Sequence, residues 1–288
     1  MRGVPVLRAA AIHDLSGFGR ASLTVAIPVL ATMGIQACPL PTAVLSSQTS
    51  GVEGFSFLDL TGNMARIMDH WADMGLRFDA VYSGFLGSPE QSGLAARCIM
   101  EFLAPDGLAV VDPVMGDNGR LDPTQTPEMV EAMRMLVSHA DVITPNFTEA
   151  CFLLGEPYRT HISGAGLKDQ LTGLVGLGTR AAVITSAPLG DDKTLSTAAY
   201  DGSRFWKVDV PRLDAFYPGT GDAFASVLTG SLLQGDSLPV AVDRAVQFVV
   251  LGIRATFGYD TPHTDGMLLE RALPSLRLPF TGGTYEEF

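Results

Sequence analysis

The sequence predicts an α/β fold with a largely parallel central sheet and helices on both faces. Short runs of β-branched and apolar residues alternate with longer segments of helical periodicity along the 288 residues. Hydrophobic residues make up 47% and charged residues only 17%, which is enough apolar material for a large core. We find no linker, repeat or charge block that divides the chain. We therefore expect a single domain over residues 1–288, without a separate lid domain.

The expected elements follow one another as βα units. A strand at Val6–Ile12 precedes a helix at Ala21–Met33, and residues 35–45 read as extended chain interrupted by Pro39 and Pro41. Later strands are expected at Asp79–Ser83, Leu108–Val111, Asp141–Thr144, Ala181–Thr185, Thr197–Tyr200 and Phe205–Val210, the last two as an antiparallel edge. Later helices are expected from Thr61 to Gly75, from Ser88 to Leu103, at Thr126–Val137, near Phe147, at Ser163–Leu177, at Thr220–Gln234 and at Leu238–Phe257.

The start signals of these helices are specific. Thr61 is expected to cap its helix, and Ser88, Pro89 and Gln91 predict a cap, a first-turn proline and a capping-box partner. The prolines and glycines of residues 273–288 predict an irregular, partly disordered C-terminal tail.

Composition excludes several classes of function. The chain has 31 acidic and 19 basic residues, a net charge of −12, and lysine occurs only at positions 168, 193 and 207. A protein that binds nucleic acid needs a basic face, so no nucleic-acid partner is expected. The longest apolar runs are too short to span a membrane, and the three cysteines have no metal-ligand or disulfide spacing. We expect a soluble cytoplasmic protein without a membrane partner.

Ligands of parallel α/β folds bind where strands end and helices begin, so functional residues are expected at those junctions. Gly219-Thr220-Gly221-Asp222 is a glycine-flanked turn that opens a helix. Its free amides and the helix dipole make an anion site that needs no lysine, although a plain loop would have the same sequence.

Two further junctions carry carboxylates. Asp112 and Asp117 follow a buried strand, where carboxylates suit magnesium, although Asp-Pro and Asp-Asn-Gly are also ordinary turn formers. Asn146 and Glu149 have the spacing of a capping box, which is compatible with a phosphate site at the same helix end.

The segment after the first strand, His13-Asp14-Leu15-Ser16-Gly17-Phe18-Gly19-Arg20, approximates a dinucleotide-binding fingerprint. That fingerprint requires an acidic residue about 20 positions on, and residues 37–45 contain none. A dehydrogenase is therefore disfavoured, and the absence of any Gly-Lys pair excludes a P-loop.

Together these motifs resemble the ribokinase superfamily of small-molecule kinases. Within it, the chain from about Arg8 to about Gly258 is similar to the pyridoxal/pyridoxamine kinases, and Thr42–Thr49 and Ser83–Ser88 resemble their substrate-side segments. The resemblance implies a ribokinase-like fold, ATP and Mg²⁺ as cofactors, a monovalent cation such as K⁺ as a further one, and a homodimer. The implied reaction phosphorylates the 5′-hydroxymethyl group of a B6 vitamer: pyridoxal, pyridoxamine or pyridoxine.

The resemblance also implies roles for individual residues. Asp222 would be the base, and the amides of Gly219, Thr220 and Gly221 would cradle the phosphoryl group. The residues implied on the nucleotide and metal side are Asp112, Asn146, Glu149, Thr185 and Ser186, with Asp112, Asp117 and Glu149 as the metal positions. The residues implied around the substrate ring are Asp14, Ser16, Thr49, Tyr82 and Phe85.

Three alternatives stay open. Asp14-Leu15-Ser16-Gly17 is closer to the hydroxymethylpyrimidine kinases of thiamin biosynthesis, although those enzymes usually have cysteine where this chain has Asp222. A sugar kinase would normally add a β lid, and no inserted run of strands follows the first helix. A non-catalytic ligand-binding member of the fold would not need Asp222.

Overall fold

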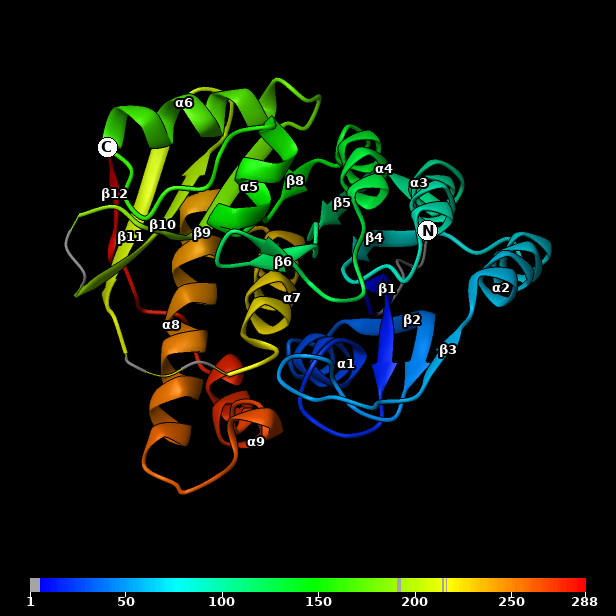
Figure 1. The fold of residues 1–288 in the computed structure, drawn as a ribbon. Coiled ribbons are helices and arrows are strands. Elements are labelled where there is room, and N and C mark those ends of the chain that lie inside the picture. Colours follow the sequence, from blue (N-terminus) through cyan, green and yellow to red (C-terminus); the bar gives the residue numbers. More distant parts are fainter. Residues whose placement is uncertain (1–5, 191–192, 214, 216) are drawn as a thin grey trace.

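The computed structural model describes residues 6–190, 193–213, 215 and 217–288. Within these residues the main sheet has the strand order β12-β11-β10-β9-β8-β5-β4-β1-β2-β3 (Figure 1). Its strands are β1 (Arg8–Ser16), β2 (Gln36–Leu45), β3 (Phe57–Asp59), β4 (Phe78–Ser83), β5 (Leu103–Val111), β8 (Val142–Ile143), β9 (Ala181–Ala187), β10 (Thr194–Tyr200), β11 (Phe205–Pro211) and β12 (Tyr285–Glu287). A separate small hairpin pairs β6 (Gly116–Asp117) with β7 (Arg120–Leu121).

The centre of the sheet, from β2 through β1, β4, β5 and β8 to β9, is parallel. The outer pairs β9–β10, β10–β11, β11–β12 and β2–β3 are antiparallel. This arrangement confirms the predicted α/β class and the predicted antiparallel edge. Pro39 and Pro41 fit within β2 because β3 pairs only with Ala43–Leu45, which leaves the outer edge of β2 free at the prolines.

Helices cover both faces of the sheet, as predicted (Figure 1). One hydrophobic core lies beneath α2 (Thr61–Asp73), α3 (Pro89–Phe102), α4 (Pro127–Val137), α5 (Phe147–Leu154) and α6 (Gly164–Val175). The other lies beneath α1 (Leu23–Thr32), α7 (Thr220–Leu233), α8 (Leu238–Phe257), α9 (Leu269–Ala272) and the 3₁₀ turn η2 (Leu273–Arg277), which follows a second such turn, η1 (His263–Asp265). Because the parallel strands all point one way, the loops after β1, β4, β5 and β8 meet at one edge of the sheet.

Two predicted helix caps are wrong in detail. Thr61 is the first residue of α2 rather than its cap, and its amide donates to the Asp59 carboxylate at 2.9 Å. Ser88 is the N-cap of α3 but makes no side-chain cap hydrogen bond. The Gln91 side chain instead accepts from the Gly87 amide at 2.8 Å and donates to the Thr42 carbonyl at 2.9 Å, which ties α3 to β2.

The C-terminal tail is more ordered than predicted. Residues 285–287 form β12, which pairs with β11 at the edge of the sheet. The fully buried Asp243 of α8 accepts from the Thr284 amide at 2.8 Å and from the Thr284 hydroxyl at 2.6 Å. Distant partners therefore order the end of the tail, while residues 278–284 form no helix or strand, as an irregular tail predicts. No helix among the described residues is long and apolar enough to cross a membrane.

Candidate active site

The glycine turn predicted as an anion site forms the N-terminus of α7. Gly219 is the N-cap residue and has the left-handed conformation, with φ 80°. A Cβ atom at this position would lie 2.0 Å from the Arg20 carbonyl oxygen, so both the conformation and the space require glycine. The amide of Ala223 is hydrogen-bonded to the Gly219 carbonyl at 3.0 Å. The amides of Thr220 and Gly221 precede it in the first turn, where helix amides lack carbonyl partners within the helix.

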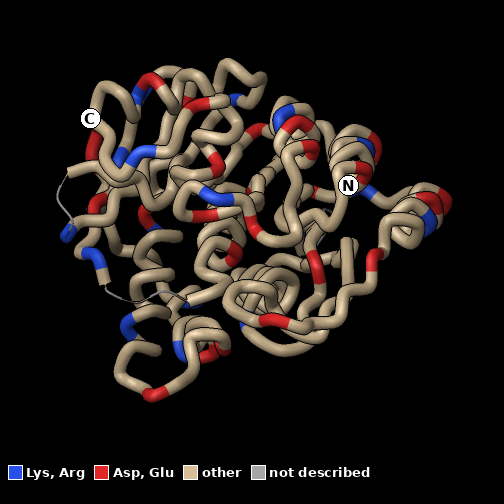
Figure 2. Tube along the Cα trace, viewed as in Figure 1, with Lys and Arg blue, Asp and Glu red and all other residues tan. Residues whose placement is uncertain are grey.

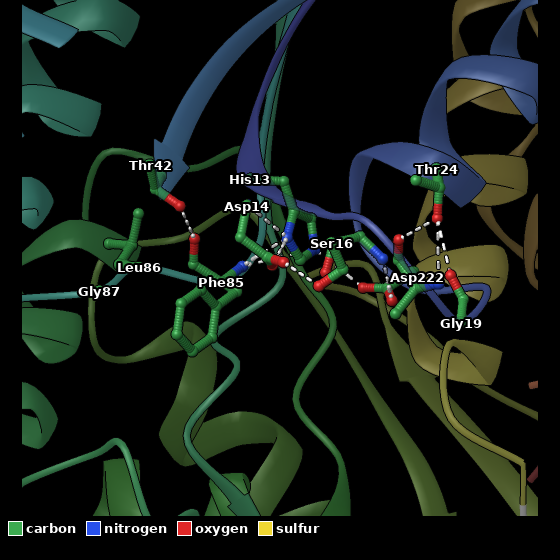
Figure 3. A network of polar contacts seen from close by, with 12 residues as sticks. His13, Asp14, Ser16, Gly19, Thr24, Thr42, Phe85, Leu86, Gly87 and Asp222 are labelled. Atoms are coloured by element: carbon green, nitrogen blue, oxygen red, sulfur yellow. Dashed lines mark hydrogen bonds and ion pairs between the residues drawn. The ribbon is translucent and has the colours of Figure 1, made fainter. Parts of the chain in front are cut away.

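Asp222 lies in that first turn with 8% of its surface exposed. Its Oδ2 accepts from the Ser22 amide at 2.7 Å, and its Oδ1 lies 2.8 Å from Nε2 of His13 (Figure 3). Ser22 has φ 59°, an unusual value for a residue with a side chain, so the loop holds that amide at a cost of about 1–3 kcal/mol. The Asp222 carboxylate is therefore fixed from two sides.

His13 joins Asp222 to Asp14. Its Nδ1 lies 3.1 Å from Oδ1 of Asp14, and Asp14 also accepts from the Ser16 hydroxyl at 2.8 Å (Figure 3). Burial opposes a charged imidazole, but the charge of Asp222 and hydrogen bonds to both carboxylates outweigh it and raise the pKa of His13 to about 10. Burial also opposes a charged Asp14, yet hydrogen bonding to His13 lowers the pKa of this carboxyl.

Asp112 directly follows β5, Glu149 lies in the first turn of α5, and both side chains are buried. Burial, followed by repulsion from Asp222, raises the pKa of Asp112 to about 7, although its Oδ1 accepts from the Thr144 hydroxyl at 2.9 Å. Burial and repulsion from Asp112 raise the pKa of Glu149 well above its ordinary value. Excess negative charge in a buried site is the condition that a bound cation would relieve.

The predicted capping box is present at the start of α5. Asn146 accepts from the Glu149 amide at 2.9 Å, and the Glu149 carboxylate accepts from the Asn146 amide at 2.8 Å and from the Met115 amide at 3.0 Å. The Asn146 side chain also donates to the Gly116 carbonyl at 2.8 Å, which ties the β6–β7 hairpin to this helix. These contacts hold the loop after β5 against the end of β8.

Asp117 lies apart from this pair. It is exposed, and its carboxylate accepts from the amide and the side chain of the following Asn118 at 2.8 and 3.1 Å. Across the ranges 6–190, 193–213, 215 and 217–288, no three His, Cys, Asp or Glu side chains are grouped closely enough to hold a metal ion by themselves. Asp112 and Glu149 fit a magnesium ion whose other ligands are water and phosphate oxygens.

Thr185 and Ser186 lie at the end of β9, beside this helix terminus. Thr185 forms an isolated parallel bridge with Asn146, and its amide donates to the Pro145 carbonyl at 3.0 Å. Ser186 is exposed and has φ 55°. Thr185 and Ser186 therefore lie at the same edge of the sheet as the capping box of Asn146 and Glu149.

The predicted substrate-side residues differ in position. Phe85 is 7% exposed, and its amide lies 3.3 Å from Nδ1 of His13 (Figure 3). Thr49 is half-buried in the loop after β2. Tyr82 is completely buried in the core beneath α7, with its ring edge-on to His13 at 6.2 Å between centroids. The structure thus places Tyr82 behind His13 rather than at the surface of the site.

His13 is the residue whose role the sequence did not predict. Alternation along β1 places it on the same face as Ala9, which belongs to the core beneath α1 and α7. A polar side chain on the buried face of a strand needs a polar partner, and that requirement was the available signal.

Acidic and basic residues are otherwise dispersed over the molecule, without a basic stripe in the view of Figure 2.

Comparison with known proteins identifies relatives of this chain. A family model described as phosphomethylpyrimidine kinase matches residues 19–266. A hydroxymethylpyrimidine/phosphomethylpyrimidine kinase of Bacillus subtilis is 30% identical over 223 residues, which cover 77% of this chain and 80% of that protein. A pyridoxine/pyridoxal/pyridoxamine kinase of Bordetella avium is 31% identical over 257 residues, which cover 83% of this chain and 82% of that protein.

Solved structures of the same two kinds of kinase are similar to this chain. A candidate phosphomethylpyrimidine kinase of Bacteroides thetaiotaomicron, crystallised with pyridoxal, is 52% identical with a TM-score of 0.95 and covers 98% of this chain and 100% of its own. Pyridoxal kinase of Lactobacillus plantarum is 32% identical with a TM-score of 0.86 and covers 95% of this chain and 97% of its own.

The parallel sheet and the aspartate at a glycine turn are those of a small-molecule kinase of the ribokinase superfamily. The family match covers most of the sheet and the site residues from Ser22 to Asp222, while His13, Asp14 and Ser16 lie just before it. The chain belongs to the phosphomethylpyrimidine kinase family, and among its members it resembles the pyridoxal kinases.

Proposed function

We propose that this kinase transfers the γ-phosphoryl group of ATP to the 5′-hydroxymethyl group of a B6 vitamer: pyridoxal, pyridoxamine or pyridoxine. The observation that carries the proposal is the fixed Asp222 carboxylate at the first turn of α7, beside the amides of Gly219, Thr220 and Gly221. The B6 assignment is supported by the 52% identical structure that holds pyridoxal.

In this proposal Asp222 accepts the proton of the substrate hydroxyl as the oxygen attacks the γ-phosphorus and ADP leaves. A positioned base of this kind contributes about 10²- to 10⁴-fold to the rate. The first-turn amides of α7 donate to the equatorial oxygens of the phosphoryl group, where charge is concentrated in the transition state. This explains how a chain with three lysines can carry out phosphoryl transfer.

The nucleotide side is assigned to Asp112, Asn146, Glu149, Thr185 and Ser186. Asp112 and Glu149 would hold Mg²⁺ largely through water, and the ion would neutralise charge on the ATP phosphates when bound. Asp117 is retained as an outer metal position, and its exposure makes it the weakest member of the set. A monovalent cation such as K⁺ is a further proposed cofactor.

The substrate side is assigned to Asp14, Ser16, Thr49 and Phe85, with Tyr82 behind them. Asp14 would pair with the protonated pyridine nitrogen or with the amine of pyridoxamine. The buried hydrogen bond from Ser16 to Asp14 keeps that carboxylate oriented.

Hydroxymethylpyrimidine is the second candidate substrate. The family description and the Bacillus subtilis relative favour it, and Asp14-Leu15-Ser16-Gly17 resembles the corresponding segment of those kinases. We also propose that the protein is cytoplasmic and that its single-domain subunits form a homodimer. Sedimentation of the purified protein would test the homodimer.

A substrate panel tests the proposed function. Purified protein with ATP and Mg²⁺ should phosphorylate at least one B6 vitamer with a kcat/KM at least about tenfold above that for hydroxymethylpyrimidine. The reverse preference would assign the chain to the pyrimidine reaction. No ATP consumption with any of these alcohols would indicate a binding protein.

A further inference from the structure

The His13 ring lies between two carboxylates in the middle of the site (Figure 3). Nδ1 is 3.1 Å from Asp14 and Nε2 is 2.8 Å from Asp222. An ionised carboxylate can only accept hydrogen bonds, so each ring nitrogen must carry a proton to bond its partner. With both carboxylates ionised, both contacts are hydrogen bonds only for the imidazolium, which places one positive charge between two negative ones; the Asp14 amide also lies 3.2 Å from Nδ1.

The His13 ring is closely packed by the backbone that follows β4. A Cβ atom on Gly84 would lie 2.1 Å from Nε2 of His13, so the backbone after β4 packs directly on the ring. The Phe85 amide lies 3.3 and 3.4 Å from the two ring nitrogens. The Tyr82 ring lies edge-on to the His13 ring, with 6.2 Å between their centroids. The His13 ring can therefore occupy this position only because residue 84 is a glycine.

We propose that His13 is a positioning residue of the phosphoryl transfer, which holds the Asp222 carboxylate for proton abstraction and couples it to Asp14 at the substrate ring. This inference rests on the proposed function of Asp222 and Asp14. His13 itself does not touch the reacting atoms in this scheme.

The coupling works through hydrogen bonds and charge. The Ser22 amide binds Oδ2 of Asp222 and His13 binds Oδ1, so the carboxylate cannot rotate away from the substrate hydroxyl. The charged and titratable groups around the imidazolium are Asp14 on its own strand, Asp222 on α7, Asp112 after β5 and Tyr82 on β4. Because His13 offsets the repulsion among these carboxylates, its loss should disfavour the ionised base.

The kinetic test compares His13→Gln and His13→Ala with His139→Asn, a control at an exposed histidine far along the chain. Glutamine can keep a donor toward Asp222 but carries no charge. We expect kcat to fall by about 10- to 100-fold in H13Q and further in H13A, with the KM for ATP changed less than about twofold. The acid limb of the kcat profile should move to higher pH in H13Q, and H139N should behave as wild type.

A wild-type kcat and pH profile in H13Q would overturn the proposal. An equal loss of kcat in H13Q and H13A with an unmoved acid limb would also overturn it, since that is the result of a packing role alone. Gly84→Ala supplies a second variant that displaces the ring while His13 is intact. It should reproduce the shifted acid limb, with folding checked by circular dichroism.

Nuclear magnetic resonance of ring-labelled histidine tests the pairing without substrate. The signals missing in H13Q identify His13, and they should report an imidazolium at about pH 8 in wild type and a lower pKa in Asp222→Asn. A neutral His13 ring at that pH would refute the pairing. If wild type phosphorylates no B6 vitamer, the proposed function fails, while these spectra still decide whether His13 is paired with Asp222.

Discussion

The stability of the fold should depend on pH through His13. Its pKa is raised from 6.5 to about 10 in the folded protein, so between these values the folded state binds a proton that the unfolded state has lost. The contribution is therefore fully present below about pH 6.5 and is lost as the pH rises through about 10. At about 1.4 kcal/mol for each pKa unit, the fully buried group could contribute up to about 5 kcal/mol, and we expect at least about 1 kcal/mol.

Urea unfolding of wild type and H13Q at several pH values between 6 and 10 measures this contribution. Other groups titrate in the same range, but they are common to both proteins, so the difference between the two slopes isolates His13. We expect the free energy of unfolding of wild type to fall more steeply with pH than that of H13Q. Parallel curves would refute the imidazolium between Asp14 and Asp222.

Three further predictions concern the metal, the substrate and the tail. Asp112→Asn should raise the Mg²⁺ concentration needed for half-maximal rate by about 10- to 100-fold, whereas Asp117→Asn should change it by less than about twofold; equal effects would contradict the distinction. Asp14→Ser should lower the ratio of kcat/KM for pyridoxamine to that for pyridoxine by about tenfold or more, and an unchanged order of preference would count against the pairing. Deletion of residues 284–288 should lower the free energy of unfolding by at least about 2 kcal/mol, because it removes the Thr284 donors from the buried Asp243; unchanged urea denaturation would show that the tail is dispensable.

The sequence predicted best those features that depend on local patterns. The alternation of strands and helices predicted the layered fold, and the spacing of Asn146 and Glu149 predicted the capping box that is present. Turn chemistry predicted that Gly219-Thr220-Gly221 opens a helix, and Gly219 is the N-cap of α7, where the backbone conformation and the close approach of Arg20 both require glycine.

Contacts between distant residues could not be predicted in the same way. His13 and Asp222 are 209 positions apart, so their pairing depends on how β1 and α7 are brought together. The tail was predicted as irregular because its own residues have weak propensity, yet β11 and Asp243 order it from outside. Tyr82 lies at the end of an apolar strand, where a tyrosine can belong either to the core or to the site. Its packing beneath α7 shows that it belongs to the core.

The central claim is that Asp222 is the base at the N-terminus of α7. Asp222→Asn keeps the size of the side chain, but its amide group cannot accept both the Ser22 and His13 hydrogen bonds. Single-turnover transfer of labelled γ-phosphate from ATP to pyridoxal, with Asp169→Asn as the exposed control, tests the claim most directly. We predict a loss of about 10²- to 10⁴-fold in D222N with ATP binding retained. Near-normal transfer by D222N would contradict the account.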